Sequence, residues 1–224
     1  MNILLVNDDG YSASGINILY ELLSKEHKVV IVAPNVSNSA KSVAITLGTP
    51  IKVAKVNDYT FSCSGTPADC VAFGLSSLST RFDLVISGIN HGLNVSYDTM
   101  YSGTVGAALQ ALTYRIPAIA ISCDSNFEIV KKYLNDVMEF IKKNNLLSTE
   151  YLLNINFPLG HLVEDIKLSH IYYRKEVTYY AKDNQGGYLA LRNINDQNCE
   201  DEDSDVYMVH HHQVSITKIN KVLG

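Results

Sequence analysis

The feature that most constrains the fold is a regular alternation between two apolar patterns along the first two thirds of the chain. Short runs of apolar residues alternate with longer segments in which apolar residues recur every three or four positions. The short runs occupy residues 3–6, 28–33, 83–87, 118–122 and 151–155. Runs of this length indicate buried strands, and the three-to-four spacing indicates amphipathic helices.

Helical segments are predicted between these strands. Their apolar positions are Ile16, Leu19, Tyr20 and Leu23; Val71, Leu75 and Leu78; a small-residue segment from about Val105; and Val130, Tyr133, Leu134, Val137, Phe140 and Ile141. Strands that alternate with helices favour a parallel sheet covered on both faces. We therefore predict a doubly wound, Rossmann-like α/β fold with a mostly parallel sheet.

The pattern changes after Phe157-Pro158 to alternating, tyrosine-rich stretches. Residues 183–187, Asp-Asn-Gln-Gly-Gly, are typical of a hairpin tip. The acidic run at 200–203 indicates a solvated loop. We expect an α/β core over residues 1–157 that carries the functional site, and a C-terminal β-rich extension over residues 158–224.

Composition excludes several classes of protein. The chain has 224 residues, of which 46% are hydrophobic and 18% are charged, and its formal net charge is −5. That charge argues against binding of a nucleic acid polymer. Its four cysteines form no CxxC pair, and no apolar run approaches the length of a membrane span. We expect buried, reduced thiols, no membrane insertion and a cytoplasmic protein.

Two adjacent carboxylates follow the first predicted strand. The sequence Asn7-Asp8-Asp9-Gly10 comes directly after the apolar run at 3–6. In parallel α/β sheets, ligands gather at the carboxyl ends of the strands, and adjacent carboxylates repel unless a cation or several donors hold them. These residues indicate a metal site, although the same four residues also form a good turn.

Three further loops should converge on Asp8 and Asp9, because each follows a strand of the same sheet. They span residues 35–40, 87–94 and 101–105, and they supply small polar side chains and glycines. Carboxylates together with hydroxyl and amide oxygens form a hard set of ligands that suits Mg²⁺, Mn²⁺ or Ca²⁺. Zinc or copper would prefer nitrogen or sulfur ligands.

The segment Ser102-Gly103-Thr104 precedes a predicted helix. A hydroxyl cap and free N–H groups at a helix N-terminus can hold a phosphate, and simple N-capping is the alternative interpretation. A second helix start has Thr66 as N-cap and Asp69 three residues later, which predicts a capping box. A catalytic Asp69 is the competing hypothesis, and Cys70 on the same helix is interpreted as a core residue.

The three consecutive histidines His210-His211-His212 are the only histidine cluster in the sequence. We expect them on a strand, where consecutive side chains point to opposite faces. Three such residues cannot all face one ion, so we do not predict a metal site there.

In this order, the motifs resemble the survival protein SurE family, metal-dependent nucleotidases also described as 5′/3′-nucleotidases. The resemblance spans nearly the whole chain. The matching segments are residues 7–10, 39–40, 65–70, 87–94, 102–105 and 214–217.

The resemblance implies a site. One divalent cation per subunit, Mg²⁺ or Mn²⁺, would be held by Asp8, Asp9, Ser39 and Asn90. Phosphate contacts would come from Asn94 and from Ser102, Gly103 and Thr104.

The resemblance also implies a cytoplasmic homo-oligomer, a homodimer or homotetramer, with the extension in dimer contacts. The chain departs from the family near its end, where His212-Gln213 replaces a usual Gly-Tyr pair and Lys218 replaces a common proline. These departures bear on the assembly contact.

The sequence thus predicts a phosphomonoesterase that hydrolyses nucleoside monophosphates, with 3′-monophosphates and short polyphosphate as further substrates. Asp8 or Asp9 would orient or deprotonate the attacking water. Two alternatives remain: a non-catalytic metal- and nucleotide-binding regulatory module, and a glycosyltransferase with a nucleotide-sugar donor. Base preference, the choice between 5′ and 3′ esters, and the physiological metal stay open.

Overall fold

The computed structural model describes residues 1–124, 126–174, 178–192, 196 and 198–220. Within these residues, a nine-stranded sheet has the strand order β3-β4-β2-β1-β5-β6-β7-β11-β8. The strands are β1 (Asn2–Val6), β2 (Lys28–Pro34), β3 (Val53–Lys55), β4 (Thr60–Cys63), β5 (Leu84–His91), β6 (Ala118–Cys123), β7 (Tyr151–Asn156), β8 (Asp165–Ser169) and β11 (Gln213–Asn220). The helices are α1 (Ser14–Leu23), α2 (Pro67–Ser77), α3 (Asp98–Tyr101), α4 (Gly103–Thr113), α5 (Phe127–Lys143) and α6 (Asp205–His210).

The central strands run parallel from β4 through β2, β1, β5 and β6 to β7. Strand β3 is antiparallel to β4, and β11 is antiparallel to β7. The predicted doubly wound α/β fold with a mostly parallel sheet is confirmed. Strands β3 and β4 were not predicted, because both are short and lie where the apolar periodicity is weak.

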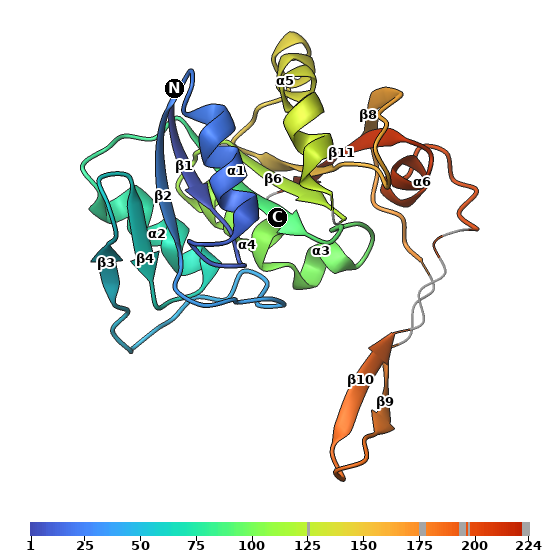
Figure 1. Cartoon of the computed structure of the whole chain (residues 1–224), viewed down its shortest axis with the longest axis horizontal. Coiled ribbons are helices and arrows are strands. Elements are labelled where there is room, and N and C mark those ends of the chain that lie inside the picture. Colours follow the sequence, from blue (N-terminus) through green and yellow to red (C-terminus); the bar gives the residue numbers. More distant parts are fainter. Residues whose placement is uncertain (125, 175–177, 193–195, 197, 221–224) are drawn as a thin grey trace.

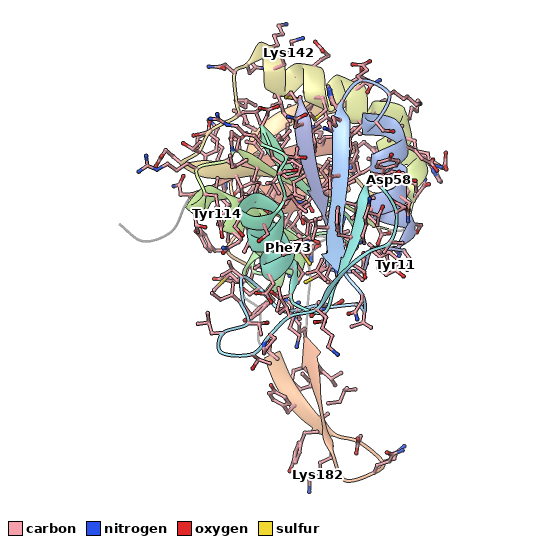
Figure 2. The ribbon with its side chains drawn as sticks, turned by 90° about the vertical axis from the view of Figure 1, so that its left-hand side faces the viewer. Tyr11, Asp58, Phe73, Tyr114, Lys142 and Lys182 are labelled. Atoms are coloured by element: carbon pink, nitrogen blue, oxygen red, sulfur yellow. The ribbon has the colours of Figure 1, made fainter. Side chains whose placement is uncertain are left out.

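Both faces of the sheet are covered by helices. Ile3 and Leu5 of β1 belong to the apolar cluster that includes residues of α1 and α5, whereas Leu4 and Val6 belong to the cluster with α2 and α4. Figure 2 shows α1 on one side of strands β1 and β2, and α2 with Phe73 on the other. Full burial of each such side chain contributes about 1.5–3 kcal/mol to folding, which explains why the buried positions of these strands, all but the first of each, are apolar.

The connections change direction between β1 and β5. Helix α1 leads from β1 to β2 on one side, and α2 leads from β4 back across to β5 on the other side. In such sheets the crevice outside the carboxyl ends of the two strands at the switch point is the usual place for a ligand. The turn after β1 and the loop after β5 both lie at this edge.

The C-terminal segment contributes to two sheets. Strands β8 and β11 extend the central sheet, and β9 (Thr178–Lys182) pairs with β10 (Tyr188–Arg192) in a separate two-stranded sheet. Figure 1 shows this hairpin extending away from the rest of the molecule. Its tip is the predicted turn at 183–187, where the Asp183 carboxylate accepts N–H bonds from Gln185 and Gly187.

The prediction that His210, His211 and His212 lie on a strand is wrong. His210 ends α6, His211 is its C-cap, and His212 has a φ of 57°. The reason is a strong helix start: the Ser204 hydroxyl accepts a hydrogen bond from Tyr207 N–H.

The structure agrees with the expectation that the cysteines are buried and unpaired. All four cysteines are buried and free. Among the described helices, none has the length and apolar character needed to cross a membrane.

Candidate metal centre

The turn after β1 is closed by Asn7, which is fully buried. Asn7 Nδ2 donates to the Gly10 carbonyl at 3.0 Å, and Gly10 N–H donates back to Asn7 Oδ1 at 3.2 Å. Gly10 has a φ of 112°, a conformation that side chains rarely allow. The two carboxylates of Asp8 and Asp9 are therefore presented at the tip of a fixed turn.

Asp8 is 4% exposed. Burial raises its pKa above the usual range; the hydrogen bond from Thr104 opposes this effect, and the charge of Asp9 adds to it. A carboxylate in this position is costly to keep ionised without a positive partner. This environment favours binding of a cation at Asp8.

Two acceptor oxygens, one from the turn after β1 and one from β5, converge on one hydroxyl. Thr104 Oγ1 donates to Asp8 Oδ1 at 2.6 Å and lies 3.3 Å from Asn90 Oδ1. Asn90 Nδ2 is bound to the Gly92 carbonyl at 2.8 Å, which orients its oxygen toward Thr104. A hydroxyl carries only one proton, so it cannot satisfy both oxygens at once. More acceptor oxygens meet here than the Thr104 proton can bond, and a hard cation would bind the remaining ones.

The start of α4 approaches Asp8 very closely at Gly103. A Cβ atom on Gly103 would lie 2.9 Å from both Cβ and Oδ2 of Asp8, and 3.2 Å from the Asn38 carbonyl. Asn38 N–H in turn donates to the Asp8 carbonyl at 2.7 Å. The start of α4 and the loop after β2 therefore both meet the tip of β1, as the sequence predicted.

Asp9 is half-buried and lies beside His91, at the end of β5. Burial raises the pKa of its carboxyl, whereas the backbone N–H and the ring of His91 lower it. Sequence reasoning missed His91 as a neighbour of Asp9. The only signal was its position inside the polar segment 87–94, since its side chain is exposed and has no distinctive spacing.

Ser39 lies in the loop after β2 and is exposed. Its hydroxyl is 3.2 Å from that of Ser37. The neighbouring residue, Asn38, attaches this loop to Asp8. The role of Ser39 as a metal ligand stays a prediction.

Asn94 belongs to a buried network of amides. Its N–H donates to Asn156 Oδ1 and its Nδ2 donates to Ser122 Oγ, both at 2.8 Å. Its carbonyl accepts from the side-chain amides of Asn154 and Asn156. This network fixes the loop after β5, and the predicted contact of Asn94 with phosphate stays a prediction.

Ser102 is the N-cap of α4, and its hydroxyl accepts a hydrogen bond from Val105 N–H at 3.1 Å. The predicted cap is confirmed. The predicted phosphate contacts of Ser102, Gly103 and Thr104 are not tested by this geometry.

The described part of the chain holds no group of three or more His, Cys, Asp and Glu side chains that could bind a metal. The candidate ligands here are instead two carboxylates with neutral amide and hydroxyl oxygens. Such ligands suit Mg²⁺ or Mn²⁺ better than zinc.

Asp69 has a structural role. It completes the predicted capping box of α2 with Thr66, and its carboxylate also accepts from Thr46 N at 2.9 Å and Thr46 Oγ1 at 2.6 Å. Burial works against its charge, but the hydrogen bonds from Thr46 and Thr66 outweigh burial and lower the pKa of the carboxyl. Asp69 thus ties the loop after β2 to α2.

Replacing Asp69 with Ala should lower the free energy of unfolding by about 2–4 kcal/mol, because a helix cap and charged hydrogen bonds to the Thr46 loop are lost. Urea denaturation would measure this change. Glu139→Ala, at an exposed carboxylate on α5, should leave stability unchanged. If Asp69→Ala kept full stability but lost enzymatic activity, Asp69 would instead have a catalytic role.

Comparison with known proteins identifies the family. The model of the family "Survival protein SurE" matches residues 3–181. The chain belongs to the SurE family.

Similar proteins cover nearly the full length of the chain. The protein named 5′-nucleotidase SurE from Clostridium botulinum (strain 657 / Type Ba4) is 39% identical over 98% of this chain and 93% of its own length. The protein of the same name from Clostridium beijerinckii is 36% identical with the same coverage. The crystal structure of the SurE protein from Aquifex aeolicus has a TM-score of 0.87 at 32% identity, covering 100% of this chain and 95% of that one. The predicted family is confirmed, and the chain is an enzyme of the 5′-nucleotidase SurE type.

Proposed function

We propose that this SurE protein is a divalent-metal-dependent phosphomonoesterase that hydrolyses nucleoside monophosphates to nucleoside and phosphate. The 5′-esters are the first candidates, and 3′-esters and short polyphosphate are further ones. The observation that carries the proposal is the convergence of Asp8 Oδ1 and Asn90 Oδ1 on the single hydroxyl of Thr104.

Asp8, Asp9, Asn90 and Ser39 would hold one cation, Mg²⁺ or Mn²⁺. The donor set supports this assignment, since two neighbouring carboxylates with raised pKa values lie beside amide and hydroxyl oxygens. When bound, such a cation neutralises phosphoryl oxygens and makes a water molecule more acidic.

The two carboxylates would have different roles in the reaction. Asp8 is almost fully buried and fixed by Thr104, so it is suited to holding a constant geometry. Asp9 is half-buried and lies beside His91, so it is better placed to orient the attacking water and accept its proton. The water oxygen then bonds to phosphorus as the ester oxygen leaves, and the leaving oxygen takes a proton from solvent.

The substrate phosphate would bind near the start of α4. Backbone N–H groups and the positive end of a helix stabilise negative charge, and Ser102, Gly103 and Thr104 form that end. Asn94 would contribute from the loop after β5. We further propose that the protein acts in the cytoplasm as a homodimer or homotetramer, with the extension over residues 158–224 in the subunit contacts.

Phosphate release from AMP tests the proposed function. We expect release with Mn²⁺ or Mg²⁺, a fall to background when EDTA is added, and recovery with excess metal. 3′-AMP and tripolyphosphate in the same panel define the substrate range. Phosphate release that continues unchanged in EDTA would reject metal dependence. Binding of AMP without any release would favour the regulatory module.

A further inference from the structure

An ion-pair network joins the C-terminal segment to α3. The Arg174 side chain is 5% exposed, and it donates from Nη2 to Asp98 Oδ2 at 2.6 Å and from Nη1 to Asp196 Oδ2 at 2.7 Å. Arg192, at the end of β10, donates to the other Asp98 oxygen, Oδ1. Each oxygen of the Asp98 carboxylate is therefore bound to a guanidinium from the extension.

Asp98 begins the turn that leads into the candidate metal centre. Helix α3 has four residues, and the carbonyl of Asp98 accepts a hydrogen bond from Ser102 N–H at 3.0 Å. A single helical turn is too short to be stable by itself. Gly103 and Thr104, which contact Asp8, follow directly. The position of these two residues depends on how firmly α3 is held.

The extension holds the same loop at a second point. The buried Asp205 carboxylate accepts from Ser96 N–H at 2.8 Å and from Tyr172 N–H at 2.9 Å. The Ser96 hydroxyl donates to the Tyr172 carbonyl at 2.6 Å. The segment between β5 and α4 is thus fastened to the extension before α3 as well as at its first residue.

We propose that Asp98 is a positioning residue, and that its ion pairs with Arg174 and Arg192 hold α3 so that Gly103 and Thr104 stay against Asp8. The proposal rests on the proposed function, because it assigns the extension a part in shaping the same metal centre. Groups that orient metal ligands commonly change metal affinity by about 10- to 100-fold when they are removed, and Asp98 would act on Asp8 in this way through α3, Gly103 and Thr104.

Asp98→Asn tests this proposal, because it keeps the size of the side chain and removes its charge. We expect the dissociation constant for Mn²⁺, measured by titration calorimetry without substrate, to rise at least about tenfold. We also expect kcat for AMP to fall more than KM changes. Both are measured at a temperature where circular dichroism shows the variant folded. Asp58→Asn removes an exposed carboxylate paired with Lys55 and should match the wild type.

Arg192→Gln is the second variant. The Arg192 side chain is 31% exposed, so this protein should fold even if Asp98→Asn does not. We expect a smaller weakening of Mn²⁺ binding, about threefold or more. The proposal is overturned if a folded Asp98→Asn variant keeps wild-type Mn²⁺ affinity and kcat. If that variant does not fold, the proposal is overturned by wild-type Mn²⁺ affinity in Arg192→Gln. Failure of the wild type to bind Mn²⁺ or release phosphate would instead reject the proposed function.

Discussion

Replacing Asp8 with Asn is expected to reduce phosphate release from AMP by about two to three orders of magnitude, comparable to removal of a central electrostatic group in other active sites. Asn has nearly the same shape but carries no charge, and its amide cannot serve as an anionic ligand. Binding of Mn²⁺ by the variant should weaken in parallel. A colorimetric phosphate assay and titration calorimetry would measure the two effects.

Stability measurements distinguish the loss of activity in Asp8→Asn from a loss of folded protein. Burial raises the pKa of the Asp8 carboxyl above its ordinary value, so in the metal-free protein the folded state binds the proton more tightly than the unfolded chain. The stability contribution of this proton is fully present below the unfolded pKa and is lost as pH rises through the folded pKa. Asp8→Asn should remove this decline without lowering the melting temperature at neutral pH.

Asp136→Asn is the matched control, since Asp136 is an exposed carboxylate on α5. It should retain wild-type activity and metal affinity. Turnover retained in Asp8→Asn would reject the assignment of Asp8 to the metal centre.

Replacing Gly103 with Ala is expected to weaken Mn²⁺ binding by up to about 100-fold and to reduce phosphate release at least as strongly. The added Cβ would lie 2.9 Å from Cβ and Oδ2 of Asp8, which is closer than real side chains approach. Asp8 cannot easily move away, because its carboxylate is bonded to Thr104 and its backbone belongs to the turn closed by Asn7. Its carboxylate must therefore move, or the start of α4 must move away from it.

The loss cannot come from a weaker helix, because Ala has a higher helix propensity than Gly. Gly160→Ala is the control for a glycine substitution elsewhere, since nothing lies within 4 Å of the added atom. Its positive φ of 87° should cost some stability without affecting metal binding. Wild-type Mn²⁺ affinity in Gly103→Ala would show that the contact with Asp8 has no functional role.

Much of the fold could be predicted because its signals are local. The apolar runs became β1, β2, β5, β6 and β7, and the capping box of Thr66 and Asp69 marked the start of α2. The three histidines were misplaced, because the helix start at Ser204 competes with an apparent strand pattern. The short strands β3 and β4 gave too little periodicity to detect.

The site was predictable only in part. Asp8 and Asn90 were expected to lie together from the rule that strand ends gather at one edge, and Thr104 connects them. His91 beside Asp9, and the guanidinium groups of Arg174 and Arg192 on Asp98, were not predicted. Arg174 and Asp98 are 76 residues apart, so no pattern along the chain indicates their contact.

The sequence by itself determined the kinds of element and the turn that presents Asp8 and Asp9. These depend on side-chain periodicity, caps and glycines within a few neighbouring residues. Only the tertiary structure decided that β5 lies beside β1 and that Thr104 bonds to Asp8, 96 residues away. It also decided that Arg174 and Arg192 of the extension bind Asp98 at the start of α3. The physical reason is that strand order and long-range ion pairs follow from burying both faces of the sheet at once, a condition on the whole chain that no local segment contains.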